Sequence, residues 1–144
     1  MEKIVSPQVF SRFFSAFSAH PITYKDITYK TVEHAYHAQR YTDPKIVYDI
    51  VDSQTPEQAW EASQRHKAFQ IPDFNERKLA VMEELFRAKL NQHADVRQAL
   101  FDSGDALIVK HEPKDSWWGD GPDGSGRNEM GKLWMRLRDE FSEA

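Results

Sequence analysis

The chain has 144 residues, of which 40% are hydrophobic and 12% aromatic, and this favours one compact globular domain over residues 1–144. Its formal net charge of -4 argues against non-specific binding to nucleic acid, which requires many cationic contacts with phosphates. The lack of cysteine excludes a disulfide scaffold, a thiol nucleophile and a cysteine-ligated zinc.

The first predicted elements are a hairpin and two helices. Residues 22–24 and 27–29 are both Ile-Thr-Tyr and are separated by two residues, which predicts a β-hairpin. Thr31 is suited to the N-cap of a helix over residues 31–41. The Asp-Pro pair at 43–44 predicts a second helix that has proline at its first position.

Two capping boxes predict further helices. The first is Thr-Pro-Glu-Gln at 55–58, and the second is formed by Asp73 and Glu76. The second box opens a longer helix because apolar residues follow it at helical spacing. These residues are Leu79, Met82, Leu85, Phe86 and Leu90.

The amino-acid composition changes in the last third of the chain. A short helix is expected over 93–101, with Phe101 in the core, and residues 106–110 (Ala-Leu-Ile-Val-Lys) are the clearest strand. A glycine-rich loop over 116–131 precedes a final helix over 132–141. Together the elements predict an α+β fold, mostly helical, with a small β-sheet.

Several functional classes lack their sequence signals. No apolar run approaches the roughly 18 residues that span a membrane, and residues 1–10 lack the layout of a secretory signal. A cytoplasmic location with no membrane partner is therefore expected. The six histidines form no HExxH or similar pattern, so no metal is expected. A Gly-x-Ser-x-Gly elbow of serine hydrolases is also absent.

The predicted helix over 31–41 carries one group of candidate site residues. Glu33, His37 and Arg40 are spaced i, i+4 and i+7, which places them on one face with Tyr36 beside them. Such a row can hold a polar ligand and move protons. The alternative is a solvated helix face with one ion pair.

A second group lies in the glycine-rich region. Trp117 and Trp118 could stack on a base, or one could fill the core while the other covers it. Asp115 precedes them, either as a functional loop residue or as a turn aspartate. Residues 119–131 form either a loop that approaches a phosphate closely or a plain connector, since their spacing fits no known phosphate-binding fingerprint.

Together, these segments resemble the NADAR family. The matching pieces are FSAF at 14–17, YKTVEHAYHAQR at 29–40, NERKLAVMEELFRAKL at 75–90, LFDSGDALIVKH at 100–111, and DSWWGDGPDGSGRNEMGKLWMRLR at 115–138. Their order and spacing agree with the family over nearly the whole chain. The combination is specific, although no single piece is.

The resemblance implies a mostly helical α+β fold and an N-glycosidase activity. YbiA-like members cleave ribosylamino-pyrimidine phosphate intermediates of riboflavin biosynthesis, whereas others remove ADP-ribose from guanine bases of nucleic acid and partner with ADP-ribosylating toxins. Family functional positions fall on Glu33, on Phe74 where tryptophan is usual, and on Asp115.

The resulting hypothesis is an N-glycosidase without cofactor or metal that hydrolyses the bond between ribose C1′ and a nitrogenous base. Its substrate would be ADP-ribosylated guanine, as nucleoside or in nucleic acid, or a ribosylamino-pyrimidine phosphate. Glu33 and Asp115 are the expected catalytic carboxylates, because charge develops on the sugar as the base leaves. The alternative is a non-catalytic module that binds ADP-ribose or NAD.

The resemblance also implies a set of substrate-binding residues. Trp118 and Phe74 would frame the base, and Arg12 or Arg40 would hold phosphate, since a guanidinium fits phosphate oxygens bidentately. The full set is Arg12, Phe14, Ser15, His37, Arg40, Phe74, Trp118, Gly119 and Asn128.

The chain departs from the family pattern in four places. Ala16 replaces an asparagine, Ser63 and Gln64 replace a Gly-Arg pair, and Phe74 lacks the N–H of tryptophan. Arg40 stands where the family often has lysine. Some members are thought to form a lysine imine with the opened ribose, which an arginine cannot do because it stays protonated. These departures put a lysine-based mechanism in doubt.

Overall fold

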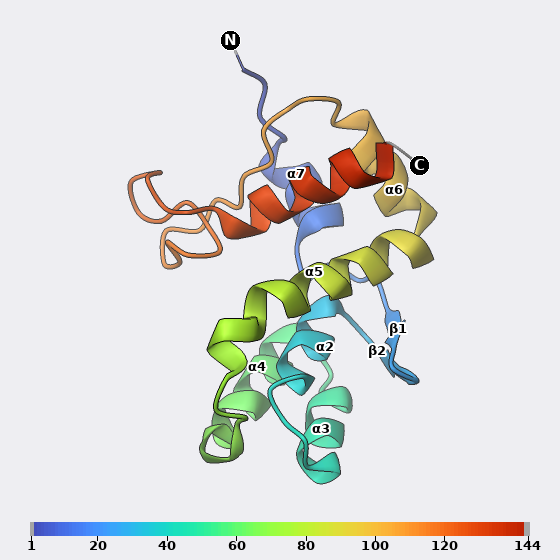
Figure 1. Cartoon of the computed structure of the whole chain (residues 1–144), viewed down its shortest axis with the longest axis vertical. Coiled ribbons are helices and arrows are strands. Elements are labelled where there is room, and N and C mark those ends of the chain that lie inside the picture. Colours follow the sequence, from blue (N-terminus) through green and yellow to red (C-terminus); the bar gives the residue numbers. More distant parts are fainter. Residues whose placement is uncertain (1, 143–144) are drawn as a thin grey trace. The chain divides into compact units, whose positions relative to one another are not determined.

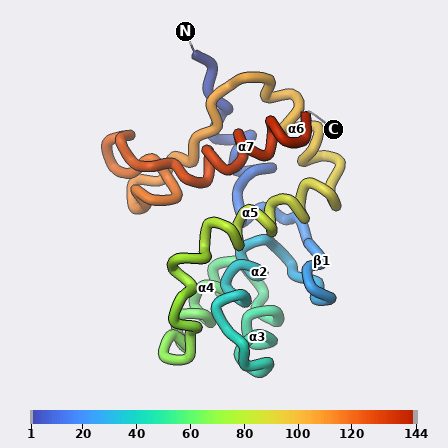
Figure 2. Tube along the Cα trace, in the orientation of Figure 1, coloured from blue at the N-terminus to red at the C-terminus, as the bar shows by residue number. Residues whose placement is uncertain are grey.

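The structure is a computed structural model that describes residues 2–142. Its Cα trace divides into two compact units: one spans Ala16–Gln92, and the other joins the residues up to Ser15 with those from His93 onward (Figure 2). The described residues are mostly helical with a single two-stranded sheet (Figure 1), which confirms the predicted α+β class.

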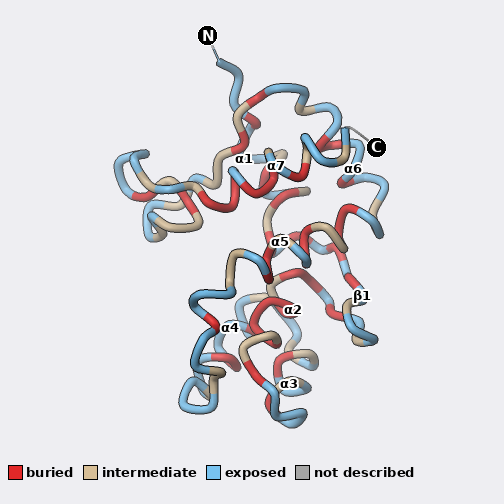
Figure 3. The backbone as a smooth tube through the Cα atoms, in the orientation of Figure 1, coloured by how far each residue is buried: buried red, intermediate tan, exposed pale blue. Residues whose placement is uncertain are grey.

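The unit Ala16–Gln92 contains the hairpin and the longest helix. Its elements are β1 (Ile22–Tyr24), β2 (Ile27–Tyr29), α2 (Val32–Ala38), α3 (Pro44–Val51), α4 (Pro56–Arg65), a 3₁₀ turn (Lys67–Phe69) and α5 (Phe74–Gln92). Helix α2 packs against α3, α4 and α5, and most of its residues are buried (Figure 3).

The hairpin forms as predicted from its two-residue turn. Lys25 and Asp26 have φ of 50° and 70°, and such left-handed turn residues match the twist of antiparallel strands. Thr23 pairs with Thr28 in the register, and their hydroxyl oxygens lie 2.9 Å apart. The amide of Gln92 accepts from Thr23 N and donates to Thr23 O, which ties β1 to the end of α5.

Side-chain caps set the starts of three helices where the sequence predicted them. Thr31 accepts from the backbone N–H of His34 at 3.2 Å, and Thr55 accepts from that of Gln58 at 3.1 Å. The Asp43 carboxylate caps α3 by accepting from Lys45 N at 2.9 Å. Each cap joins residues only two or three positions apart, so the sequence alone could predict it.

The start of α5 differs in detail from the predicted capping box. Helix α5 begins at Phe74, and the carbonyl of Asp73 accepts from Glu76 N at 3.2 Å. The Asp73 side chain lies 3.8 Å from Arg77. Four of the five predicted apolar positions are buried, Leu79 being the intermediate one.

Lys89 was not expected in the core of this unit. It is fully buried on α5, and its Nζ donates to Ser18 Oγ at 2.6 Å. Ser18 Oγ in turn lies 2.7 Å from His20 Nδ1. A buried ammonium needs such hydrogen bonds because burial alone would strongly disfavour its charge.

The other unit is built from both ends of the chain. Its elements are α1 (Pro7–Val9), the π-helical turn η1 (Phe10–Phe14), α6 (Ala94–Asp102) and α7 (Glu129–Ser142). Trp134 is fully buried, packs its ring 4.9 Å from that of Phe14, and donates from Nε1 to Phe14 O at 2.8 Å. Among the described residues, no helix is long and apolar enough to cross a bilayer.

Residues 106–110 do not form the predicted strand. Only Leu107 makes a β-bridge, a parallel one to Ile4. Side chains satisfy much of the remaining backbone: Asn128 donates to Ile108 O and accepts from Lys110 N, both at 2.9 Å. The prediction was wrong because an amide side chain takes the place of a neighbouring strand.

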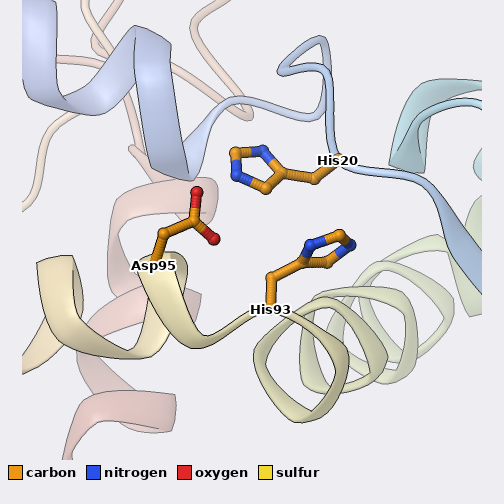
Figure 4. Close-up of side chains that lie close together, drawn as sticks. All are labelled: His20, His93 and Asp95. Carbon is orange, nitrogen blue, oxygen red and sulfur yellow. The ribbon is translucent and has the colours of Figure 1, made fainter.

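The prediction that Phe101 lies in the core was also wrong. Helix α6 buries Val96, Ala99 and Leu100, whereas Phe101 is 76% exposed. Helix α6 is preceded by His93 as its N-cap residue, and Asp95 lies in its first turn (Figure 4). The ring of Phe101 therefore faces solvent. In so short a helix, the spacing of apolar residues did not show which of them are buried.

Gly131 allows α7 to approach the extended segment. A Cβ at this position would lie 1.9 Å from Ile108 O, far inside contact distance. We expect Gly131→Ala to lower the free energy of unfolding by about 2–3 kcal/mol, in the upper range for overpacking. Thermal melts would measure this.

Gly104→Ala is the matched control for that substitution. Its Cβ would meet no atom within 4 Å, but its φ is 58°, so it isolates the backbone strain of about 1 kcal/mol. A loss at Gly131 no larger than the loss at Gly104 would contradict the packing explanation.

Candidate active site

Three of the predicted site residues form one hydrogen-bonded row: Glu33 and His37 lie on α2, and Arg40 lies in the turn after it. The helix ends at Ala38, three residues earlier than predicted. Arg40 Nε donates to His37 Nδ1 at 3.1 Å, and His37 Nε2 lies 3.1 Å from Glu33 Oε2. An arginine nitrogen can only donate, so Nδ1 is the unprotonated nitrogen of His37. Nε2 therefore carries the hydrogen and donates it to Glu33.

Burial separates this row from an ordinary solvated helix face. The side chains of His37 and Glu33 are only 4% and 13% exposed. Among the described residues, His37 is the only hydrogen-bond partner of the Glu33 side chain, and it contacts Oε2. The second oxygen, Oε1, has no such partner among the described residues.

Arg40 is fixed by aromatic rings as well as hydrogen bonds. Its guanidinium carbon lies 4.5 Å from the ring centroid of Phe74 and 5.1 Å from that of Tyr36. Its Nη1 donates to Gln70 Oε1 at 3.2 Å. Phe74 is 1% exposed, so it supports Arg40 from beneath and offers little open surface on which a base could stack.

The start of α2 is held by a buried histidine that sequence reasoning did not single out. His34 Nε2 donates to Ser53 O at 3.0 Å, and Nδ1 lies 2.8 Å from Thr31 Oγ1. Burial disfavours the imidazolium and lowers the pKa of His34, although the carbonyl of Ser53 opposes this shift. Glu33 itself is anchored by its backbone N–H, which donates to Ala16 O at 3.0 Å.

Asp115 organises the turn that carries both tryptophans. Its Oδ1 accepts from Trp117 N at 3.0 Å and from Trp118 N at 2.9 Å, as in a turn aspartate. The two indole rings meet edge to face at 4.7 Å, and both are half-buried. Each tryptophan therefore keeps some surface open to solvent.

The glycine-rich loop is folded back on itself by backbone contacts. Gly119 O accepts from Asn128 N at 2.9 Å, and Asp120 O accepts from Gly126 N at 2.7 Å. A Cβ at Gly126 would lie 2.6 Å from the carbonyl carbon of Asp120, so glycine is needed there. The loop is thus a packed element rather than a plain connector.

Asp120 secures the same loop through its side chain. Its Oδ2 lies 2.6 Å from His111 Nδ1, and its Oδ1 accepts from Glu112 N at 2.9 Å. Burial alone would raise the pKa of Asp120, but the hydrogen bonds and the charge of His111 together outweigh it, and the pKa is lowered.

Three predicted binding residues lie near the start of the chain. Arg12 is exposed, with its guanidinium over the ring of Phe13, while Phe14 is fully buried against Trp134. Ser15 lines a cavity of about 190 Å³, together with Phe10, Ser11, Pro7, Val109, Lys110 and His111. Phe14 thus has a packing role, whereas Arg12 is exposed and Ser15 borders a cavity.

The predicted site residues fall into both units. One unit brings together Glu33, His37, Arg40 and Phe74. The other contains Arg12, Phe14, Ser15, Asp115, Trp118, Gly119 and Asn128. Asn128 has both amide atoms engaged with the extended segment, which gives it a structural role. The catalytic and binding roles of the whole set remain predictions.

A model of the NADAR domain matches residues 2–142. The chain belongs to the NADAR family. Among its NADAR relatives, an N-glycosidase of Nostoc punctiforme is 37% identical over 131 residues, covering 89% of this chain and 84% of that protein. The N-glycosidase YbiA of Escherichia coli is 34% identical over 129 residues, covering 90% and 81%.

A riboflavin biosynthesis protein of Vibrio vulnificus is 31% identical over 131 residues, and the chain spans 36% of that protein. The NMR structure of Escherichia coli YbiA has a TM-score of 0.82 to this chain at 34% identity, covering 90% of this chain and 77% of YbiA. The NADAR chain therefore shares the fold of YbiA.

Proposed function

We propose that this NADAR protein is an N-glycosidase that hydrolyses the bond between ribose C1′ and a nitrogenous base. The observation that carries the proposal is the environment of the Glu33 carboxylate. This side chain is 13% exposed, and one of its two oxygens is hydrogen-bonded to His37. Two relatives that the chain covers over four fifths of their length are named N-glycosidases.

The chemistry needs an anionic group close to the sugar. As the C1′–nitrogen bond breaks, positive charge develops on C1′ and the ring oxygen, and a carboxylate stabilises it. Water then adds its oxygen to C1′, one proton goes to the departing base, and the products are the free sugar hydroxyl and the free base. Glu33 is the group that faces this charge, and Asp115 is the second catalytic carboxylate.

We favour ADP-ribosylated guanine as the substrate, free or within nucleic acid, over a ribosylamino-pyrimidine phosphate. The support is the set of departures from the family pattern, at Ala16, Ser63, Gln64, Phe74 and Arg40. The reaction as proposed uses no metal and no cofactor. A cytoplasmic location, expected from the sequence, belongs to the same proposal.

One turnover assay tests this function. The protein is incubated separately with ADP-ribosylated guanosine and with a ribosylamino-pyrimidine phosphate, and the products are measured by mass spectrometry. Release of guanosine together with ADP-ribose supports the proposal, and release of pyrimidine alone moves the substrate to the second group. A protein that gains thermal stability with ADP-ribose but releases no base would be a binding module instead.

Trp118 is proposed to stack on the base or adenine of the ligand. We expect Trp118→Ala to raise the Kd for ADP-ribose about 5- to 150-fold, the range for losing one base–aromatic stack. Isothermal titration would measure this. Phe101→Ala is the control, because it also removes an aromatic ring but one that is 76% exposed and lies on α6. If Trp118→Ala only unfolds the protein, the stacking role is refuted.

A further inference from the structure

The row of Glu33, His37 and Arg40 sets the tautomer of a buried histidine. His37 receives a hydrogen bond on Nδ1 from Arg40 Nε, so its remaining hydrogen lies on Nε2 and points at Glu33. The hydroxyl of Ser63 lies 3.4 Å from the same Nδ1, a longer and weaker contact. Arg40 is therefore the principal group that fixes which nitrogen of His37 is the donor.

We propose that Arg40 and His37 are positioning residues that hold Glu33 as an oriented anion. This rests on the proposed function of Glu33. The hydrogen from His37 Nε2 stabilises the charged form of the carboxylate and restrains its rotation, so that Oε1 faces the ligand. Glu33 is then the group that stabilises charge on the sugar, and the proton needed by the departing base comes from elsewhere.

The surroundings explain why an arginine suits this task. The guanidinium is planar and always charged, and its Nε–H points in one fixed direction within the plane. Phe74, Tyr36 and Gln70 hold that plane in place, so the hydrogen on Nε can be aimed at His37. Two of its five N–H groups are used by His37 and Gln70. Its other N–H groups have no hydrogen-bond partner within residues 2–142 and can bind an anionic ligand.

The tautomer can be tested without any enzymatic assay. Two-dimensional NMR of the full chain with ¹⁵N-labelled histidine distinguishes Nδ1–H from Nε2–H, and His37→Gln identifies the His37 signals among the six histidines. We expect the Nε2–H form at neutral pH. Arg40→Met should shift the His37 Nδ1 signal, whereas Arg65→Met, at an exposed arginine on α4, should leave it unchanged.

Kinetics then separate positioning from simple ligand binding. We expect Arg40→Met and His37→Leu each to lower kcat by about tenfold with little change in KM, as when one orienting hydrogen bond is lost. His37→Gln should stay within about threefold of native kcat, because its amide retains one donor and one acceptor. Arg65→Met should match the native enzyme.

Two results would overturn the inference. One is an Nδ1–H tautomer in the native protein, or an unchanged His37 spectrum in Arg40→Met. The other is a rise in KM at constant kcat for Arg40→Met, which would make Arg40 a phosphate ligand only. If no base is released from any substrate, the proposed function fails, while the NMR result still decides whether Arg40 sets the tautomer.

Discussion

Glu33→Gln is expected to lower kcat for base release by about 10²–10³-fold, the range for removing one electrostatic stabiliser of a transition state. Glutamine keeps the shape of the side chain and can still accept the hydrogen of His37 Nε2. What is lost is the negative charge opposite the developing positive charge on the sugar. Affinity for ADP-ribose and the melting temperature should remain close to native.

Glu61→Gln is the matched control for this variant. Glu61 is an exposed residue in the middle of α4, so the same chemical change there should leave kcat unaltered. Steady-state kinetics with mass-spectrometric detection of free base would compare the two. Near-native turnover in Glu33→Gln would remove Glu33 from the mechanism.

Asp115→Asn is expected to lower kcat by about 10²-fold while the fold stays intact, if this carboxylate acts through its charge. Asn Oδ1 can accept from the backbone N–H groups of Trp117 and Trp118, as Asp115 does now. The asparagine variant therefore removes the negative charge but keeps the hydrogen bonds of the turn. Asp115→Ala should lose the turn as well and melt at a lower temperature.

Asp123→Asn provides the control within the same loop. Asp123 Oδ1 accepts from Ser125 N at 3.1 Å and from Ser125 Oγ at 2.6 Å, so it makes a similar local turn without a proposed catalytic role. Its kcat should match the native value. Equal rates for Asp115→Asn and Asp123→Asn would reduce Asp115 to a turn aspartate.

Elements specified by neighbouring residues could be predicted from the sequence. The hairpin follows from two Ile-Thr-Tyr segments around a two-residue turn, and the starts of α2, α3 and α4 follow from Thr31, Asp43 and Thr55. In the candidate site, spacing predicted Glu33, His37 and Arg40 on one helix face. Hydrogen bonds do link the three, although α2 ends at Ala38 and Arg40 lies in the turn after it.

Features that depend on distant residues could not be predicted in this way. Residues 106–110 have the composition of a strand, but the amide of Asn128 pairs with their backbone in place of a strand. Spacing could not show that Phe74 lies beneath Arg40, or that Lys89 would be buried beside Ser18. Each of these depends on a partner brought near only by folding.

The unit formed from both chain ends has a consequence for synthesis. The backbone of Val5 pairs with Leu107, and Phe14 O pairs with Trp134, 120 residues further along. Closing so long a loop costs conformational entropy. The contact between Phe14 and Trp134 cannot form until helix α7 has been synthesised. Residues 2–15 therefore cannot make these contacts until residues 93–142 have also been synthesised. The unit Ala16–Gln92 is contiguous and has no such delay. During translation it can therefore fold before the other unit does.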